Sequence, residues 1–293
     1  MHILLLGKRG QLGFELNRQL APDYELTSLD SSQLDLTRPE EIRTVIKTIK
    51  PDLLINAAAY TAVDKAETDQ EQAFAVNAHA PEVMAVELAK FGGAMIHYST
   101  DYVFDGAASK PYRETDKPNP QSVYGQSKLL GEQAIQNSSV AALIFRTSWV
   151  FGEYGSNFLL TMRKLMQERV ELSVVDDQVG APTWTFDLAK ATVLILQQFE
   201  DSPDWAEKTG LYHMSSAGQT SWYDFAIEIA RQLQQQGKQV AQIRPISTVE
   251  YPTAAQRPAY SILDNSLLAE TFSINLPEWQ SFFKNHLSTE SVN

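Results

Sequence analysis

The stretch HILLLGKRGQLG, residues 2–13, decides the fold. Its first five residues are almost all apolar, which predicts a buried strand, and a helical pattern over 11–20 follows. The loop between them has the spacing G-x-x-G-x-x-G. Gly7 permits a tight turn, Gly10 lets the backbone approach a pyrophosphate, and Gly13 allows close packing of helix on sheet. This order is typical of a dinucleotide-phosphate site, although a tight turn without a ligand has the same pattern.

The same alternation continues through the first half of the chain. Short apolar runs predict further strands, at 24–29, 52–56, 94–99 and 141–146. The segments between them predict helices, at 39–49, 70–91 and 124–137. Nearly continuous apolar strands that alternate with helices predict an α/β protein with a doubly wound parallel sheet of the Rossmann type. We therefore expect a dinucleotide-binding domain over residues 1–150.

The rhythm of strands and helices loosens after residue 150. Elements are still predicted, with helices at 156–168, 185–199 and 221–236 and strands at 171–175 and 211–214. The tail from residue 237 is irregular and contains several prolines. We expect a smaller, mainly substrate-binding region over 151–293. Either this region stands apart, or its segments near 171–214 return to the main sheet.

Composition and charge exclude several classes of protein. The 293 residues carry a formal net charge of −12 and no basic run, which argues against nucleic-acid binding. The chain has no cysteine, so disulfides, thiolate catalysis and zinc–thiolate sites are excluded. No apolar run approaches the roughly 18 residues of a membrane span, and the apolar start is too short for a signal peptide. We expect a cytoplasmic protein. The five histidines have no metal-like spacing, so we predict no metal site from them.

Two opposed signals concern the choice of cofactor. Asp30 ends the second predicted strand, where an acid accepts hydrogen bonds from an adenosine ribose and repels a 2′-phosphate, which favours NAD. Lys8 and Arg9 lie inside the glycine loop and could pair with that phosphate, which favours NADP. The alternative is that both cations are solvated and that Asp30 only begins a turn. We expect either NADPH or NADH to bind, with NADPH slightly preferred.

The helix predicted over 124–137 begins with two residues suited to acid–base chemistry. Tyr124 and Lys128 are four residues apart, so both side chains lie on one helical face. An ammonium beside a phenol favours the phenolate and would lower the tyrosine pKa from about 10. Ser99 and Thr100 would emerge at the carboxyl edge of the sheet, where Thr100 can hydrogen-bond a substrate oxygen or the phenol.

Taken alone, the Y-x-x-x-K spacing is more often that of an ordinary surface helix. The ordered set is far less common: a glycine loop, an acid after the second strand, an S-T pair after the fourth, then Y-x-x-x-K. That set predicts a reductase in which Tyr124 gives its proton to a carbonyl oxygen as hydride arrives at carbon. Lys128 would also hold the ribose hydroxyls of the nicotinamide.

The ordered set resembles the extended short-chain dehydrogenase/reductase family. In detail, the sequence from residue 1 to about 280 resembles one branch of that family, the dTDP-4-dehydrorhamnose reductases. The segments that carry this resemblance are GKRGQLG (7–13), INAAAYTAVDKAE (55–67), YSTDYVFDG (98–106), VYGQSKLLGE (123–132), FRTSWVFG (145–152), DDQVGAPT (176–183) and GLYHMSSAGQTSWYDFA (210–226). The resemblance implies reduction of the C4 keto group of dTDP-4-dehydro-L-rhamnose to dTDP-L-rhamnose.

The resemblance also implies roles for individual residues. Tyr124 matches the family's proton donor, Lys128 its cofactor-holding lysine, and Thr100 the residue that tunes the tyrosine. The matching cofactor positions are Gly10, Gln11 and Leu12 for the pyrophosphate, Asp30, Asp35 and Leu36 for the adenosine, and Ala59, Tyr60, Thr61 and Tyr98 for the nicotinamide. The matching substrate positions are Thr100, Asp101, Trp149 and Arg257. An indole such as that of Trp149 can pack against the C–H surface of a sugar, although a core aromatic has the same sequence signal.

One departure from the resembled family concerns metal. Some of its members dimerise around a magnesium ion held by acidic side chains, and Glu15 has the right type for a ligand. The stretch WTFDLAKA (184–191) contains only Asp187 where an acidic cluster would be expected. This departure argues against a metal-bridged dimer, although a bound magnesium ion stays open, as do both a monomer and a homodimer. The expected partner is a dTDP-sugar, with no nucleic acid and no membrane.

Two other functions fit parts of the same pattern. A sugar-nucleotide epimerase or dehydratase of the extended family shares the tyrosine and the lysine but recycles a tightly bound nicotinamide. A non-catalytic, NADP-binding regulatory subunit of methionine adenosyltransferase resembles these reductases without performing the reaction. The presence of both Tyr124 and Lys128 argues for an enzyme.

Overall fold

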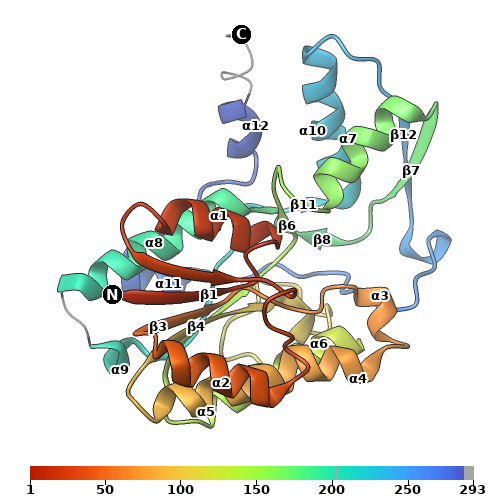
Figure 1. The fold of residues 1–293 in the computed structure, drawn as a ribbon. Helices are drawn as coiled ribbons and strands as arrows, with labels where there is room; N and C mark the ends of the chain where they lie inside the picture. Colours follow the sequence, from red (N-terminus) through yellow and green to blue (C-terminus); the bar gives the residue numbers. More distant parts are fainter. Residues whose placement is uncertain (202–203, 287–293) are drawn as a thin grey trace.

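The structure, a computed structural model, describes residues 1–201 and 204–286 (Figure 1). Residues 202–203 and 287–293 of the region predicted over 151–293 lie outside this part. At the centre is a six-stranded sheet, in the order β10-β5-β4-β3-β1-β2, in which every pairing is parallel. Its strands are β1 His2–Leu6, β2 Glu25–Leu29, β3 Leu53–Asn56, β4 Ala94–Thr100, β5 Ala141–Thr147 and β10 Gly210–His213. The predicted doubly wound parallel sheet is confirmed.

The order of the strands fixes where a ligand can enter. β1 pairs with β2 on one side and with β3 on the other, so the chain changes direction across the sheet at β1. The loops that leave the carboxyl ends of β1 and β3 therefore diverge and leave a crevice. The strands themselves are apolar on both faces, and all four residues of β3 are buried.

Helices cover both faces of this sheet (Figure 1). On one face lie α1 Gln11–Leu20, α8 Thr185–Asp201 and α11 Ser266–Phe272, whose apolar residues share a core with the strands. On the other face lie α2 Pro39–Ile49, α5 Ala80–Ala89 and α6 Val123–Gln136. Pro39 stands at the first turn of α2, followed by Glu40 and Glu41, which is the predicted start of that helix.

The helix predicted over 70–91 is interrupted. It consists of α4 Gln70–Phe74, a π-helical turn Ala75–His79, and α5. Asn77, in the π turn, donates to the Tyr60 carbonyl and accepts from the Tyr60 amide, and its own carbonyl lies against Gly131 of α6. These contacts come from distant parts of the chain, so local periodicity did not reveal the π turn.

A smaller region stands beside the carboxyl edge of the sheet. It contains α7 Phe158–Glu168, β7 Glu171–Val175, α10 Trp222–Gln235 and β12 Gln242–Ile246, with β7 and β12 paired in parallel (Figure 1). Its core is rich in aromatic rings, among them Phe151, Phe225, Trp279, Phe282 and Phe283.

Short elements connect the smaller region to the sheet. Two further pairings are β6 Val150–Phe151 with β9 Thr183–Trp184, and β8 Val179–Gly180 with β11 Thr220–Ser221. Of the segments near 171–214, α8 and β10 lie with the main sheet, whereas β7 belongs to the smaller region. The remaining helices are α3 Val63–Ala66, α9 Trp205–Lys208 and α12 Ser281–His286, and short 3₁₀ turns lie at Asp101–Val103 and Thr248–Glu250.

Candidate active site

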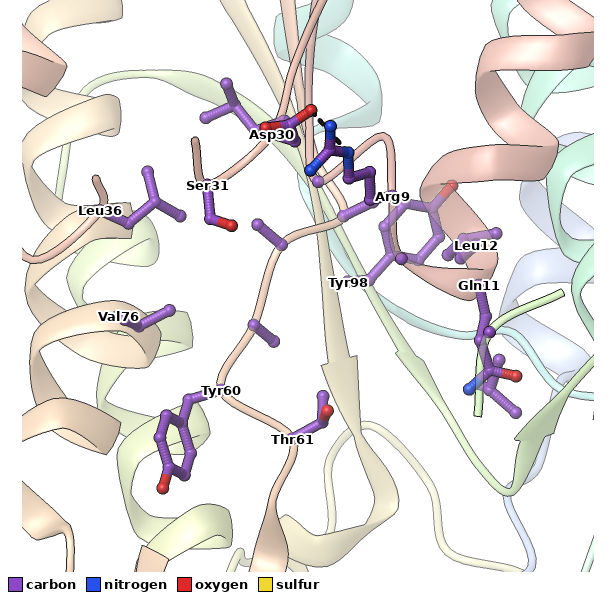
Figure 2. A pocket seen from close by; sticks show the side chains of 18 of the residues that line it. Arg9, Gln11, Leu12, Asp30, Ser31, Leu36, Tyr60, Thr61, Val76 and Tyr98 are labelled. Atoms are coloured by element: carbon purple, nitrogen blue, oxygen red, sulfur yellow. Dashed lines mark ion pairs between the residues drawn. The ribbon is translucent and has the colours of Figure 1, made fainter. Parts of the chain in front are cut away.

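A cleft of about 580 Å³ follows the carboxyl ends of β1, β3, β4 and β5 (Figure 2). This volume lies within the range of small-molecule and cofactor sites. The predicted site residues that line it are Gly7, Gly10, Gln11, Leu12, Asp30, Asp35, Leu36, Ala59, Tyr60, Thr61, Tyr98, Tyr124 and Lys128. Its lining does not include Gly13, Thr100, Asp101, Trp149 or Arg257. The structure thus brings all the predicted cofactor residues except Gly13 together in the lining of one cleft, and the predicted substrate residues lie outside that lining.

The glycine loop forms one end of the cleft. Gly7 has a φ of +89°, and a Cβ there would lie 2.8 Å from the amide nitrogen of Ala58. A Cβ on Gly13 would lie 2.0 Å from the Gly7 carbonyl oxygen, so only glycine allows α1 to approach the loop this closely. Gly10 is the N-cap of α1 and makes no side-chain cap. The first-turn amides of α1 therefore remain available to an anion in the cleft.

Asp30, Lys8 and Arg9, which gave opposed predictions for the cofactor, form one cluster of charged side chains. Asp30 is buried, and its Oδ2 atom lies 3.1 Å from Nε of Arg9 (Figure 2). The same atom lies 3.7 Å from Nζ of Lys8. Hydrogen bonds from Ser32 lower the pKa of Asp30, and the two cations add to this effect. Lys8 also donates to the Ser28 carbonyl and to Gln33. Arg9 lines the cleft and Lys8 does not, so Arg9 is better placed than Lys8 to contact a ligand in the cleft.

One wall of the cleft is built by the loop after β3. The loop residues Ala59, Tyr60 and Thr61 line the cleft, and Asn77 holds the backbone of Tyr60 through two hydrogen bonds. Opposite them, the hydroxyl of Tyr98 pairs with that of Thr192 at 2.6 Å. These hydrogen bonds hold the Tyr60 backbone and the Tyr98 hydroxyl in place at the cleft.

Tyr124 lies at the far end of the cleft, in the first turn of α6. Ser122 caps this helix by accepting from the Gly125 amide. The Tyr124 ring meets Tyr102 edge to face, with centroids 5.5 Å apart. Burial raises the pKa of Tyr124 well above its ordinary value; a hydrogen bond with Thr100 opposes this rise, and Asp101 adds to it. The expectation of a lowered pKa is therefore wrong for this structure, because desolvation of the phenolate outweighs any help from a cation.

Lys128 is almost fully buried, with 2 % of its surface exposed. Its Nζ atom donates to the carbonyl of Tyr98 at 2.6 Å and lies 3.2 Å from Nε2 of His97. Burial lowers the lysine pKa to about 8, and Glu132, the next residue along that helical face, opposes this effect. Glu132 is also paired with Arg146, at 2.6 Å, so the Arg146 cation balances much of the negative charge that Glu132 presents to Lys128.

Thr100 and Asp101 lie behind the phenol, at the end of β4. The Thr100 hydroxyl donates to Oδ1 of Asp101 at 3.0 Å and also meets Tyr124. A hydroxyl carries one proton, so Thr100 can donate to only one of these two groups at a time. Asp101 is 2 % exposed, and burial raises its pKa to about 6. Its Oδ2 atom has no hydrogen-bond partner among the described residues.

Trp149 and Arg257 lie where the sheet meets the smaller region. Trp149 has a φ of +46°, which is unusual for a residue other than glycine, and its ring stacks on Trp222 with centroids 3.5 Å apart. One face of the indole is therefore covered. Arg257 donates to Asp64 at 2.8 Å and to the hydroxyl of Tyr102 at 3.3 Å. Through Tyr102, Arg257 is one side chain away from Tyr124.

The acids considered as metal ligands have other contacts. Glu15 accepts two hydrogen bonds from Arg18, at 2.8 and 3.1 Å. Asp187 lies in the first turn of α8, where burial raises its pKa to about 6. Within residues 1–201 and 204–286 no three acidic or histidine side chains are grouped as metal ligands. Over the same residues, no helix combines the length and the apolar character of a membrane span.

The sequence did not reveal several residues of the site. Thr147, the last residue of β5, lines the cleft together with Val150, Gly155 and Ser156 from the segment that follows. Asn77 supports the Tyr60 loop, and His97 contacts Lys128 from inside β4. None of these residues belongs to a spacing that local rules recognise. Ser99 and Thr147 also line the cleft, and their buried hydroxyls have no hydrogen-bond partner in the part of the chain that the structure describes, which only the three-dimensional structure reveals.

Comparison with known proteins agrees with this geometry. The family model described as the RmlD substrate binding domain matches residues 1–291. A dTDP-4-dehydrorhamnose reductase of Burkholderia thailandensis is 46% identical over 285 residues, which cover 96% of this chain and 96% of that protein. One of Escherichia coli K12 is 42% identical over 294 residues, covering 98% and 97%.

A solved structure is similar over nearly the whole chain. It is a dTDP-4-dehydrorhamnose reductase of Bacillus anthracis in complex with NADP, 34% identical, with a TM-score of 0.88 and 98% of each chain covered. The fold, the family model and the relatives all agree. The chain therefore belongs to the RmlD substrate binding domain family, together with the dTDP-4-dehydrorhamnose reductases.

Proposed function

We propose that this chain reduces the C4 keto group of dTDP-4-dehydro-L-rhamnose to give dTDP-L-rhamnose, with NADPH or NADH as reductant. The observation that carries the proposal is a single cleft with an anion site at one end and Tyr124 with Lys128 at the other. The names of the relatives support the same substrate.

The residues of the cleft fit a nicotinamide dinucleotide. The uncapped first turn of α1 would hold the pyrophosphate, while Asp30, Arg9 and Leu36 would surround the adenosine ribose. The unpartnered hydroxyls of Ser99 and Thr147 would meet polar groups at the nicotinamide end. When bound, such a cofactor supplies the hydride. Since Arg9 already neutralises Asp30, the site would accept a ribose with or without a 2′-phosphate.

Tyr124 would act as the proton donor. A raised pKa keeps the phenol protonated at neutral pH, which is the form that a donor needs. As the keto oxygen gains negative charge, the Tyr124 proton would move to it. Thr100 and Lys128 would then stabilise the phenolate, Thr100 by turning its single proton from Asp101 to Tyr124.

The sugar nucleotide would lie between the cofactor cleft and the smaller region. On that side Asp101 influences Tyr124, Arg257 contacts Tyr102, and Trp149 stacks on Trp222 of the smaller region. This proposal includes cofactor binding by residues 1–150 and mainly substrate binding by residues 151–293. A cationic Arg257, already paired with Asp64, would offer its remaining donors to a diphosphate.

The proposal can be tested with the full chain and a panel of 4-keto nucleotide sugars. NADPH absorbance should fall only with a dTDP-linked 4-keto-6-deoxy sugar, with one NADPH consumed for each product formed. Product analysis should give dTDP-L-rhamnose. The absence of NADPH consumption with dTDP-4-dehydro-L-rhamnose would overturn the proposal.

The same assay separates the other two functions. An epimerase or dehydratase would be purified with stoichiometric NAD and would turn over without added reductant. A regulatory subunit would bind NADPH, consume none with any sugar, and change the activity of methionine adenosyltransferase.

A further inference from the structure

A buried histidine contacts the lysine of the site from inside the sheet. His97 is the fourth residue of β4 and is 0 % exposed. Its Nε2 atom lies 3.2 Å from Nζ of Lys128, and its Nδ1 atom lies 3.1 Å from Nδ2 of Asn56. Asn56, 1 % exposed, is the residue of β3 that pairs in register with His97. These three side chains form a buried polar row behind the cleft.

The direction of the hydrogen bonds in this row can be worked out from Ala58. The amide nitrogen of Ala58 can only donate, and it lies 3.2 Å from Oδ1 of Asn56. The other end of the Asn56 amide, Nδ2, therefore faces His97, and an NH₂ group can only donate. Nδ1 of His97 must accept this hydrogen bond. Since burial lowers the pKa of His97 well below its ordinary value, the ring is neutral and has one proton, which is left for Nε2.

This places an N–H group opposite the Lys128 side chain. An ammonium has three donors and no lone pair, so it cannot pair with that N–H, whereas a neutral amine can accept from it. The carbonyl of Tyr98 accepts from Lys128 in both forms. The other ionisable groups around Lys128 are Glu132 and Tyr124 on α6 and Arg146 on β5, and Arg146 is paired with Glu132.

We propose that His97 is a positioning residue: it stabilises Lys128 as a neutral amine held in the sheet and turns the ammonium form toward the cleft. This inference rests on the proposed function for its role in turnover. After Tyr124 has given its proton to the substrate oxygen, a proton passes from the Lys128 ammonium to the Tyr124 phenolate. The amine that remains accepts from Nε2–H of His97, and a proton from solvent later restores the ammonium.

The tautomer of His97 can be measured without any turnover. We suggest ¹⁵N NMR of the full chain labelled at its histidine rings, with the His97 signals identified by comparison with His97→Gln. We expect a protonated Nε2 and an unprotonated Nδ1. The Nε2 shift should titrate near the pH at which Lys128 loses its proton, about 8, and should stop titrating in Lys128→Met. A proton on Nδ1, or an Nε2 shift that is constant from pH 6.5 to 10, would overturn the proposal.

The conservative variant Asn56→Asp should reverse the direction of the hydrogen bonds in this row. A carboxylate can still accept from Ala58 but cannot donate, so Nδ1 of His97 would have to carry the proton. The lone pair of Nε2 would then accept from the Lys128 ammonium. The same NMR experiment should show the opposite tautomer, and an unchanged tautomer would contradict the role assigned to Asn56.

The effect on pH dependence has a definite sign. The ammonium form of Lys128 is present below its pKa and is lost above it, so NADPH affinity and turnover should fall as pH rises through about 8. In His97→Leu the Lys128 amine loses its hydrogen-bond donor, so the lysine pKa should rise. The fall of NADPH affinity and turnover at alkaline pH, here called the alkaline limb of the pH profile, should then move up by about half to one pH unit. His213→Leu is the matched control, because His213 is equally buried but its ring lies against Phe104 and not against Lys128.

The two readouts separate this proposal from the proposed function. The limb should be followed both in NADPH binding, by fluorescence titration, and in turnover. An unmoved limb in a folded His97→Leu protein, or an equal shift in His213→Leu, would overturn the role of His97. If His97→Leu does not fold, NMR of the unchanged chain still decides the tautomer. The predicted tautomer without reduction of any nucleotide sugar would instead reject the proposed function alone.

Discussion

The buried layer beneath α2 and α5 and the core of the smaller region are packed in different ways. The first consists of aliphatic side chains and methionines from β1, β3, β4 and β5 and from the helices that alternate with them. The second is rich in aromatic rings that meet edge to face, such as Phe151 on Phe282 at 5.1 Å. Its strand β7 pairs with β12, which comes much later in the chain.

This difference shows which part of the molecule can vary independently. The sheet is held by many short-range units, each a strand followed by a helix, and the cofactor cleft lies at its edge. The smaller region is held by a few large rings and long-range pairings. We therefore expect changes at the sheet edge to alter chemistry without loss of stability, and changes in the aromatic core to alter stability without loss of cofactor binding.

The largest effect is expected for Tyr124→Phe, at the sheet edge. Turnover should fall by about 10² to 10⁴-fold, the scale of general acid catalysis, because the proton donor is removed. Stability and NADPH affinity should be retained, as measured by urea unfolding and fluorescence titration. Tyr112→Phe is the control, since that phenol pairs with Asp105 away from the cleft. Near-normal turnover of Tyr124→Phe would show that another group donates the proton.

The aromatic core should respond in the opposite way. Phe225 is fully buried among the rings of the smaller region, and Phe225→Ala should lower the free energy of unfolding by about 3–5 kcal/mol. Urea unfolding would measure this loss, and NADPH affinity of the folded protein should change little. A large loss of NADPH affinity in the folded variant would show that the two regions depend on each other more than their packing indicates.

Trp149, between the two regions, tests where the substrate lies. Removal of its indole in Trp149→Ala should raise KM for the dTDP-sugar by about tenfold, the scale of one aromatic contact, while NADPH affinity is unchanged. Trp205→Ala is the control, because Trp205, the first residue of α9, stacks on Phe199 and is not part of the cleft lining. If both variants raise KM equally, the effect is one of stability and not of contact.

The smallest effect is expected at the mouth of the cleft. Arg9 is exposed and pairs with Asp30, so Arg9→Ala should weaken NADPH relative to NADH by only a few-fold. The ratio of the two dissociation constants measures this preference. Lys8→Ala should change the ratio less, because Lys8 contacts Gln33 and Ser28 rather than the cleft. Arg231→Ala, on the exposed face of α10, serves as the control. An unaltered ratio in Arg9→Ala would place the 2′-phosphate elsewhere.

Local patterns predicted the sheet half well because its elements are set by nearby residues. Gly7, Gly10 and Gly13 indicated a turn and a helix start, and the structure has both. The expectation for Asp30 followed from the end of the second strand, whereas Asp35, Leu36, Ala59, Tyr60, Thr61 and Tyr98 were expected only from the resemblance. The same patterns did not reveal the π turn around Asn77, the stacked pair Trp149 and Trp222, or the raised pKa of Tyr124. Each of these depends on a group far away in the sequence.

By itself, the sequence determined the order of the functional segments along the chain. These are the glycine loop after β1, the S-T pair at the end of β4, and Tyr124 and Lys128 on one face of α6. It did so because helices and strands present side chains with fixed periods. Only the tertiary structure decided the charges of these groups. The burial of Lys128, which packs from α6 against β4, and the desolvation of Tyr124 arise from which segments pack together, and no spacing in the sequence encodes that.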